Sequence, residues 1–347
     1  MGFEPTSRAH ASSPPSRSIS RRELLALEVA SLREDAGYWI RVHRRAMACR
    51  FEVMLSGELG HHVPAAREAL DEVDRIESAL TVFRDTSDLV ALNRAAGRGP
   101  VPVGGELFRL LQLCRDLHAA TGGAFDVTST PLSRCWGFLR REGRLPSPEE
   151  IAGARALVGM DAVELDETAR TVRFRRPGME LNLGSIGKGY ALGRVGSLLR
   201  RRGVREALVS AGGSSVLALG GRDGGWVIDL RSRRVRRDRL ARLRLRDTAL
   251  GTSGAGEQFV EIDGIRYGHV LDPRTGQPAA GVLGVSVAVA DPALADALST
   301  AFLVGGEDLA RAYCAEHPGT LALVTPDDGS EQPRVLGECP GAALEAA

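Results

Sequence analysis

The chain has 347 residues, enough for one large domain or for two to three smaller lobes. Hydrophobic residues make up 43% of it and charged residues 26%, so it can bury a core and is not a disordered protein. The 45 basic and 44 acidic side chains leave a net charge of +1, which argues against a nucleic-acid or membrane-surface partner. No apolar run approaches the ~20 residues of a membrane span, and five scattered cysteines without a CxxC pair argue against a disulfide scaffold or a zinc knuckle.

The N-terminal segment is rich in Ser, Pro and Arg over residues 1–20, and we expect it to be disordered. Residues 20–26, SRRELLA, are weakly similar to a twin-arginine export signal, but charges at 28 and 33–35 interrupt the apolar stretch that such a signal needs. We favour an amphipathic helix that carries Leu24, Leu25, Leu27 and Leu32. The prediction is therefore a cytoplasmic protein with an N-terminal extension over residues 1–40.

Helices and strands alternate irregularly along the rest of the chain. Apolar spacing and capping residues predict helices over 63–83, 107–121, from 147, and over 185–201, 291–304 and 307–316, and a short helix or turn over 87–93. Strands are predicted over 47–55, 162–165, 171–174, 180–183, 282–289 and 321–324, with several short ones between 207 and 270. Because many strands are separated by hairpin-length gaps, the pattern favours an α+β fold with a largely antiparallel sheet. We expect the functional domain over 41–330 and a loose tail over 331–347.

A run of arginines occupies residues 231–246, with nine Arg and one Asp. It is either a basic patch for phosphate or nucleic acid, or a hairpin with a solvated face. No aromatic side chains are interleaved to stack on bases, so we favour the hairpin.

Two glycine-rich segments combine polar side chains with turns. In TGGAFDVTSTPLSRCWGF, residues 121–138, a helix C-cap explains Gly122 and Gly123 but not Asp126 and Thr128. In ELNLGSIGKGYALGRV, residues 180–195, a strand leads through a glycine-rich turn into a helix, which is typical of an anion site, although the spacing is not that of a P-loop. Lys188 lies in this turn and is the only lysine among the 45 basic residues, which favours a specific role for its compact ammonium group.

Two further segments offer a histidine and hard oxygen ligands. In RYGHVLDPRTGQP, residues 266–278, His269 and Asp272 are either an oriented base and its partner or a structural pair. In DPALADALST, residues 291–300, Asp296 and Thr300 share one helical face and present oxygen atoms that suit Mg²⁺, although this spacing alone is common.

Taken in order, these segments resemble the ApbE family of flavin transferases, the FAD:protein FMN transferases, over residues 46–325. The similar runs are TGGAFDVTSTPL with WGF (121–138), NLGSIGKGYALG (182–193), SAGGSS (210–215), TSG (252–254), HVLDPRTGQP (269–278) and ADALSTAFLVG (295–305). The chain departs from the family pattern at Ala48 and Cys49 (Gly and Thr), Asn182 and Gly193 (both Asp), and Gly268 (often His).

The resemblance implies a two-lobed α+β fold with FAD in the cleft between the lobes. It places flavin or adenine contacts at Met47, Phe83, Ala124, Phe125, Asp126, Asn182, Lys188 and Val270. It also implies that Mg²⁺ is held by the backbone carbonyl of Ser185 and by the side chains of Asp296 and Thr300.

The activity implied is a post-translational flavinylation. FMN passes from FAD to a Thr or Ser hydroxyl of a partner flavoprotein with an FMN-binding domain, and AMP leaves. His269 is the candidate general base. Two alternatives stay open at this point: Mg²⁺-dependent hydrolysis of FAD to FMN and AMP, and FAD binding without turnover.

Overall fold

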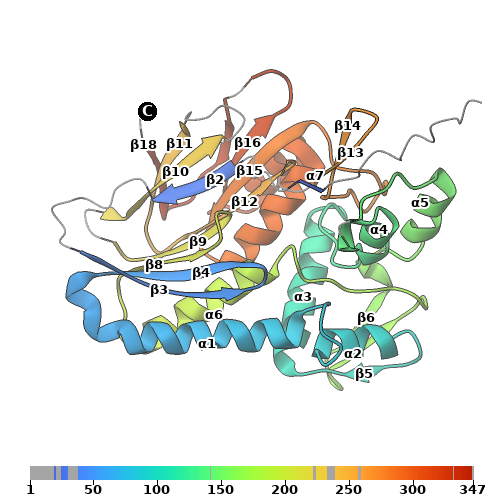
Figure 1. Cartoon of the computed structure of the whole chain (residues 1–347), viewed down its shortest axis with the longest axis horizontal. Coiled ribbons are helices and arrows are strands. Elements are labelled where there is room, and N and C mark those ends of the chain that lie inside the picture. Colours follow the sequence, from blue (N-terminus) through green and yellow to red (C-terminus); the bar gives the residue numbers. More distant parts are fainter. Residues whose placement is uncertain are drawn as a thin grey trace, which may run out of the picture.

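The centre of the molecule is an eight-stranded antiparallel sheet (Figure 1). The structure is a computed structural model, and it describes residues 19–20, 25–29, 38–140, 142–221, 224–232, 239–256, 259–330 and 332–345. The strand order is β17-β16-β15-β12-β9-β8-β4-β3. The strands are β3 (Trp39–Ala46), β4 (Cys49–Ser56), β8 (Ala207–Ala211), β9 (Ser215–Leu219), β12 (Ala249–Gly254), β15 (Val282–Val289), β16 (Leu321–Pro326) and β17 (Arg334–Gly337). The predicted α+β class with an antiparallel sheet is confirmed.

Three long helices cover one face of this sheet, as Figure 1 shows: α1 (Val63–Leu80), α6 (Gly187–Arg201) and α7 (Pro292–Glu316). Side chains alternate across the sheet, so Phe51, Val53 and Leu55 of β4 join the core beneath the helices, whereas Met54 faces the other way. Asp291 caps α7 through the N–H groups of residues 293 and 294, and the helix breaks at Gly306, where φ is +74°. That break accounts for the two helices predicted over 291–304 and 307–316.

A second, four-stranded sheet covers the opposite face, in the order β18-β11-β10-β2. Its strands are β2 (Leu25–Val29), β10 (Trp226–Ser232), β11 (Arg239–Leu245) and β18 (Ala342–Glu345). The core between the two sheets includes Leu208 and Leu250 from one and Ile228 and Leu243 from the other. β10 and β11 form the hairpin predicted for the arginine run, whose residues 233–238 lie outside the described part of the chain.

The remaining elements pack beside the end of the central sheet (Figure 1). They are α2 (Asp88–Ala95), α3 (Gly105–Ala120), α4 (Thr130–Cys135), α5 (Pro148–Arg155), the sheet of β5 (Val101–Pro102), β6 (Val163–Asp166) and β7 (Thr171–Phe174), and the sheet of β1 (Ile19–Ser20), β13 (Phe259–Ile262) and β14 (Ile265–Gly268). Three 3-10 turns complete the described structure: η2 (Gly57–His62), η3 (Phe138–Arg140) and η4 (Met160–Ala162). The Trp136 indole N–H donates to the Gly276 carbonyl at 2.9 Å, which ties α4 to the loop over 269–278.

Three sequence predictions are wrong. The segment around Leu27 is the strand β2, not an amphipathic helix, because Leu25, Leu27 and Val29 also satisfy a period of two and β10 offers an edge to pair with. The tail is not loose over 342–345, since β18 pairs with β11. Residues 180–183 form only an isolated bridge from Glu180 to residue 129 rather than a strand.

The third of these errors is explained by a contact with a residue far away in the sequence. The side-chain amide of Asn93 donates to the carbonyl of Leu181 at 2.9 Å and accepts from its N–H at 2.8 Å. A side chain therefore satisfies the backbone groups that a neighbouring strand would otherwise bond.

The predicted disorder over residues 1–20 falls outside the described residues, except that Ile19 and Ser20 pair with β13. The domain boundaries at 40 and 330 stay a prediction, although strands on their outer sides pair with strands inside them. In the described part of the chain, no helix combines the length and apolar character needed to cross a membrane.

Candidate active site

Segments far apart in the sequence meet at one cavity of about 290 Å³. The loop before α4, the turn before α6, the end of β12, the loop after β14 and one face of α7 form its walls. The predicted site residues in its lining are Ala124, Phe125, Asp126, Asn182, Ser185, Lys188, His269, Val270, Asp296 and Thr300. The fold thus brings together all the predicted residues except Met47 and Phe83.

Asp296 provides a buried carboxylate on α7, with only 4% of the residue exposed. Its Oδ2 accepts a hydrogen bond from the Gly189 N–H at 3.0 Å, and its Oδ1 accepts one from the Ser215 hydroxyl at 3.3 Å. The ammonium group of Lys188 lies 3.8 Å from Oδ1. A buried charge is costly unless it is paired and hydrogen-bonded, and these contacts meet that requirement.

Two glycines allow the backbone to close around Asp296. A Cβ on Gly189 of α6 would lie 2.0 Å from the Pro292 carbonyl oxygen, and one on Gly251 of β12 would lie 2.4 Å from the Ala295 carbonyl oxygen. Only glycine permits such close approach at both positions. The turn of α7 that carries Asp296 is therefore held between α6 and β12.

Lys188 lies at the N-terminal turn of α6, where the helix dipole favours an anion. Its ammonium group donates to the Ser214 hydroxyl at 2.6 Å, and Ser214 belongs to the turn between β8 and β9. The run SAGGSS was noted in the sequence without a role for its serines. In the structure they anchor Lys188 and Asp296.

A group of hydroxyls surrounds Thr300. The Ser253 hydroxyl lies 3.2 Å from Thr300 Oγ1 and 2.8 Å from Ser299 Oγ, and Thr300 donates to the Asp296 carbonyl at 3.4 Å. Ser253 lines the cavity and was not predicted, although the run TSG pointed to its segment.

This donor set suits a hard cation, because carboxylate, hydroxyl and carbonyl oxygens are the ligands that Mg²⁺ prefers. Asp296 and Thr300 lie one helical turn apart, and Ser185 lines the same cavity. Among the described residues, no group of three or more His, Cys, Asp or Glu side chains could hold a metal ion. A cation here would therefore depend on one carboxylate and on neutral oxygens, with the rest of its shell supplied by substrate or water.

His269 follows β14 and lines the cavity at the start of a tightly bonded loop. In that loop the Asp272 carboxylate accepts two hydrogen bonds from the Arg274 guanidinium, both at 2.9 Å, and this pairing raises the pKa of Arg274. Of the two interpretations of the pair His269 and Asp272, the structure supports a structural role for Asp272, which shapes the loop that presents His269.

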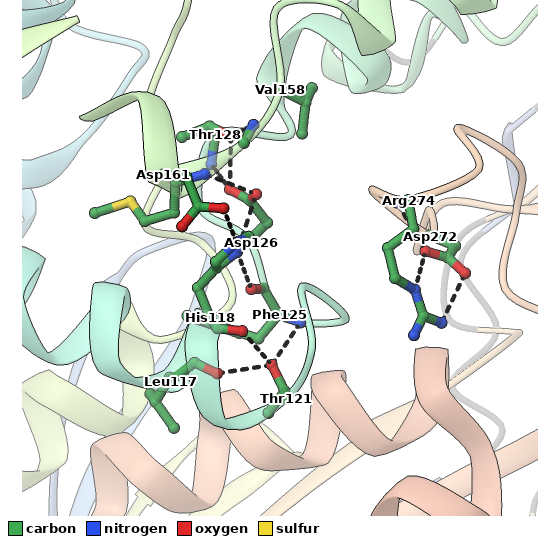
Figure 2. Close-up of polar contacts among 12 residues, drawn as sticks. Leu117, His118, Thr121, Phe125, Asp126, Thr128, Val158, Asp161, Asp272 and Arg274 are labelled. Atoms are coloured by element: carbon green, nitrogen blue, oxygen red, sulfur yellow. Dashed lines mark hydrogen bonds and ion pairs between the residues drawn. The ribbon is translucent and has the colours of Figure 1, made fainter.

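The side chains of Asp126 and Asn182 both accept hydrogen bonds from other residues of this chain. Asp126 Oδ1 accepts from the N–H and the hydroxyl of Thr128 at 2.7 and 2.6 Å, and Oδ2 accepts from the Met160 N–H at 3.1 Å (Figure 2). Asn182 Oδ1 accepts from the Gly184 N–H at 2.9 Å. These bonds give Asp126 and Thr128 the structural explanation that a helix cap alone did not provide.

Met47 and Phe83 do not line the cavity. The Met47 N–H donates to Glu77 Oε1 at 2.9 Å, in the turn between β3 and β4, and Phe83 is 75% exposed beyond the end of α1. Their predicted roles as flavin or adenine contacts stay predictions.

A polar cavity that combines a helix N-terminus, an ammonium group and a buried carboxylate is the kind of site that binds a phosphorylated ligand together with a divalent cation. Residues 47–325 match the ApbE family, and the chain belongs to that family.

Several proteins of known structure or curated function are similar to this chain. FAD:protein FMN transferases from Klebsiella pneumoniae and Treponema pallidum are 34% and 32% identical to it, over 71% and 80% of this chain and 76% and 82% of their own lengths. The ApbE protein of Thermotoga maritima has a TM-score of 0.77 at 29% identity, covering 84% of this chain and 96% of its own. The flavin transferase ApbE of Vibrio cholerae has a TM-score of 0.74 at 26% identity, covering 86% and 97%.

Proposed function

We propose that this protein transfers FMN from FAD to a Thr or Ser hydroxyl of an acceptor flavoprotein and releases AMP. The observation that carries the proposal is the meeting of Lys188, Asp296 and Thr300 at one cavity, in a chain whose relatives are named for this activity. The acceptor is proposed to carry an FMN-binding domain, as the family resemblance implies.

The cavity offers different chemistry to different parts of FAD. The N-terminal turn of α6 and the Lys188 ammonium favour the pyrophosphate. Ala124, Phe125 and Val270 offer apolar surface for the flavin ring, and Asn182 adds polar groups. Met47 and Phe83 lie outside the cavity lining, and both are proposed to be flavin or adenine contacts.

Mg²⁺ is the proposed cofactor, held by Asp296, Thr300 and the carbonyl of Ser185. When bound, it would neutralise charge on the pyrophosphate. The chain's own contribution is to hold the Asp296 carboxylate in place through hydrogen bonds from Gly189 and Ser215 and to bury most of it.

The proposed reaction forms one bond and breaks one. The acceptor hydroxyl oxygen attacks the phosphorus on the FMN side, the bond from that phosphorus to the bridging oxygen breaks, and AMP leaves with the bridging oxygen. His269 is proposed to take the hydroxyl proton, because it lines the cavity and imidazole titrates near neutral pH.

The test measures AMP release and FMN fixed to protein, with and without a candidate acceptor domain, for the wild type and for Asp296→Ala. We expect the wild type to need both Mg²⁺ and acceptor for covalent FMN, and Asp296→Ala to lose turnover, because the only carboxylate proposed for the cation is gone. Full activity of Asp296→Ala at ordinary Mg²⁺ concentrations would contradict the metal assignment. AMP release without covalent FMN would indicate a hydrolase, and bound FAD that stays intact would indicate a binding protein.

His269→Ala tests the base separately. FAD affinity should stay within a few-fold of wild type, and transfer should fall by about 10²–10⁴-fold, the usual range for a lost general base. A collapse of FAD affinity with normal transfer at saturating FAD would instead make His269 a substrate contact.

We also propose that the protein acts in the cytoplasm. The segment that follows Ser20-Arg-Arg is charged, and residues 25–29 of it pair along their length with β10 as part of the folded sheet. Fractionation of the producing cell tests this, and recovery of the protein outside the cytoplasm would contradict it.

A further inference from the structure

The loop over residues 121–126 forms one wall of the cavity, and it turns back sharply from the end of α3. Gly122 and Gly123 have φ of +55° and +76°, and the Gly123 N–H donates to the His118 carbonyl at 2.9 Å. The Thr121 hydroxyl donates to the Leu117 carbonyl at 2.7 Å and accepts from the Phe125 N–H at 3.1 Å. The position of Phe125 and Asp126 in the wall thus depends on contacts with the last turn of α3.

The side chain of His118 completes these contacts. It lies in that last turn, with 13% of the side chain exposed, and its Nδ1 is 3.2 Å from both the Phe125 carbonyl and Asp126 Oδ2 (Figure 2). Both neighbours accept hydrogen bonds, so Nδ1 carries a hydrogen whether the ring is neutral or charged. A second proton is added at Nε2, which lies 3.8 Å from Asp161 Oδ2.

We propose that His118 is a positioning residue, which holds Phe125 and Asp126 and so fixes the wall of the cavity that binds FAD. This inference rests on the proposed function in one respect, which is that FAD is the ligand of the cavity. Asp126 also connects His118 to other parts of the wall. Its carboxylate accepts hydrogen bonds from Thr128 and Met160, and so it links α3 to η4.

The charges around His118 make this role depend on pH. Asp126 and Asp161 favour the charged imidazole, whereas burial of the ring opposes it. Arg155, Arg176 and Arg274 are the other charged side chains that line the 560 Å³ cavity beside His118. The hydrogen bond to Asp126 dominates and raises the pKa of His118. Because a charged donor makes a stronger hydrogen bond, the wall is held more firmly when His118 is protonated.

The experiment measures the dissociation constant of FAD by calorimetry on the full chain, without acceptor, for wild type and three variants. The amide nitrogen of Asn can take the place of Nδ1, whereas that of Gln reaches the place of Nε2. We expect His118→Ala and His118→Gln to weaken FAD binding about tenfold, and His118→Asn to stay within about threefold of wild type.

The pH dependence of the FAD dissociation constant is a second measurement, and a residue with only a structural role would leave it unchanged. Wild-type FAD affinity should fall roughly threefold to tenfold between about pH 6 and pH 8 beyond any change in His118→Asn. His269 also lines the FAD cavity, but it is common to both proteins, so its effect cancels in this comparison. The exposed His43 of β3 gives the matched control, and His43→Asn should keep the wild-type profile.

Equal dissociation constants for the Asn and Gln variants, or identical pH profiles for wild type and His118→Asn, would overturn the inference. If His118→Ala does not fold, the difference in FAD dissociation constant between His118→Asn and His118→Gln still tests the inference. Failure of the wild type to bind FAD would remove the proposed function and this inference with it, whereas normal FAD binding by every variant would remove the inference alone.

Discussion

Met47 and Ala48 form the two-residue turn between β3 and β4, with φ of +49° and +58°. Both central residues of this hairpin turn need the left-handed conformation, which costs an L-residue with a side chain about 1–2 kcal/mol. Ala48 stands where the ApbE pattern has Gly, and it is exposed, so its methyl group is not part of the core. The turn is therefore strained at the place where the chain departs from its family.

We predict that Ala48→Gly stabilises the protein by about 0.5–1 kcal/mol, since relief of strain exceeds the added entropy of the unfolded chain. Urea unfolding of the two proteins measures the difference. Ala46, buried in regular β3, provides the contrast, because Ala46→Gly should destabilise. A loss of stability in Ala48→Gly would show that the turn is not strained.

His118 should also make stability depend on pH. Its folded pKa is raised above the unfolded value of 6.5, mainly by the hydrogen bond to Asp126. The stabilisation is thus fully present below the unfolded pKa and is lost as pH rises through the folded pKa. Between about pH 6 and pH 8 the wild type should lose free energy of unfolding relative to His118→Asn, and parallel curves for the two proteins would contradict this.

At the scale of elements, the packing of α6 against α7 positions Asp296. The Gly189 N–H donates to the Asp296 carboxylate, and its Cα lies so close to α7 that a side chain has no room. Gly187 lies in the same turn of α6, and apart from its chain neighbours and the nearby backbone of α6 itself, no atom lies within 4 Å of the place where a Cβ would lie. Alanine at position 189 therefore tests the close packing of α6 against α7, whereas alanine at position 187 tests only the helix propensity of that turn.

Gly189→Ala should destabilise the protein by about 3 kcal/mol, because the new methyl group forces α6 and α7 apart while the N–H donor is retained. Gly187→Ala should change stability by less than about 1 kcal/mol. Thermal unfolding of both variants tests this, and similar melting temperatures for the two would show that the helices do not meet as described.

The sequence predicts much at this scale because capping is local. Ser87 and Ser147 cap the helices that begin after them, and Ser147 forms a capping box with Glu150. By contrast, residues 25–29 fit the periods of both a helix and a strand, and only the edge of β10, some 200 residues away, selects the strand. The distant partner of Asn93 is equally absent from any local pattern.

At the scale of the whole molecule, the ordered motifs predicted which segments form the site, because each motif keeps its own local turn. They did not predict that Asp126 bonds within the protein, that Ser253 joins Thr300, or that Met47 and Phe83 lie outside the cavity lining. Those facts depend on how α3, β12 and α7 pack against one another.

The C-terminal strand is a second feature of the whole molecule. β18 covers the edge of β11, the Arg246 N–H donates to the Gly341 carbonyl at 2.8 Å, and Arg244 pairs with Glu345.

Removal of residues 341–347 should lower the free energy of unfolding by about 2 kcal/mol, because it uncovers an edge strand and part of the second core. Gly341→Ala should act in the same direction, since a Cβ there would lie 1.7 Å from Thr248 Oγ1. Unchanged urea unfolding in both variants would mean that the tail is not part of the fold.

We propose that this chain moves FMN from FAD to a hydroxyl of another protein. The most direct measurement is the intact mass of a purified acceptor domain after incubation with the full chain, FAD and Mg²⁺, beside an acceptor in which the target Thr is replaced by Val. We predict a mass gain of one FMN less one water on the Thr-bearing domain, one AMP released per modified acceptor, and no gain with Asp296→Ala or with the Val acceptor. Release of AMP with no mass gain on the acceptor would show that the protein does not transfer FMN to the acceptor.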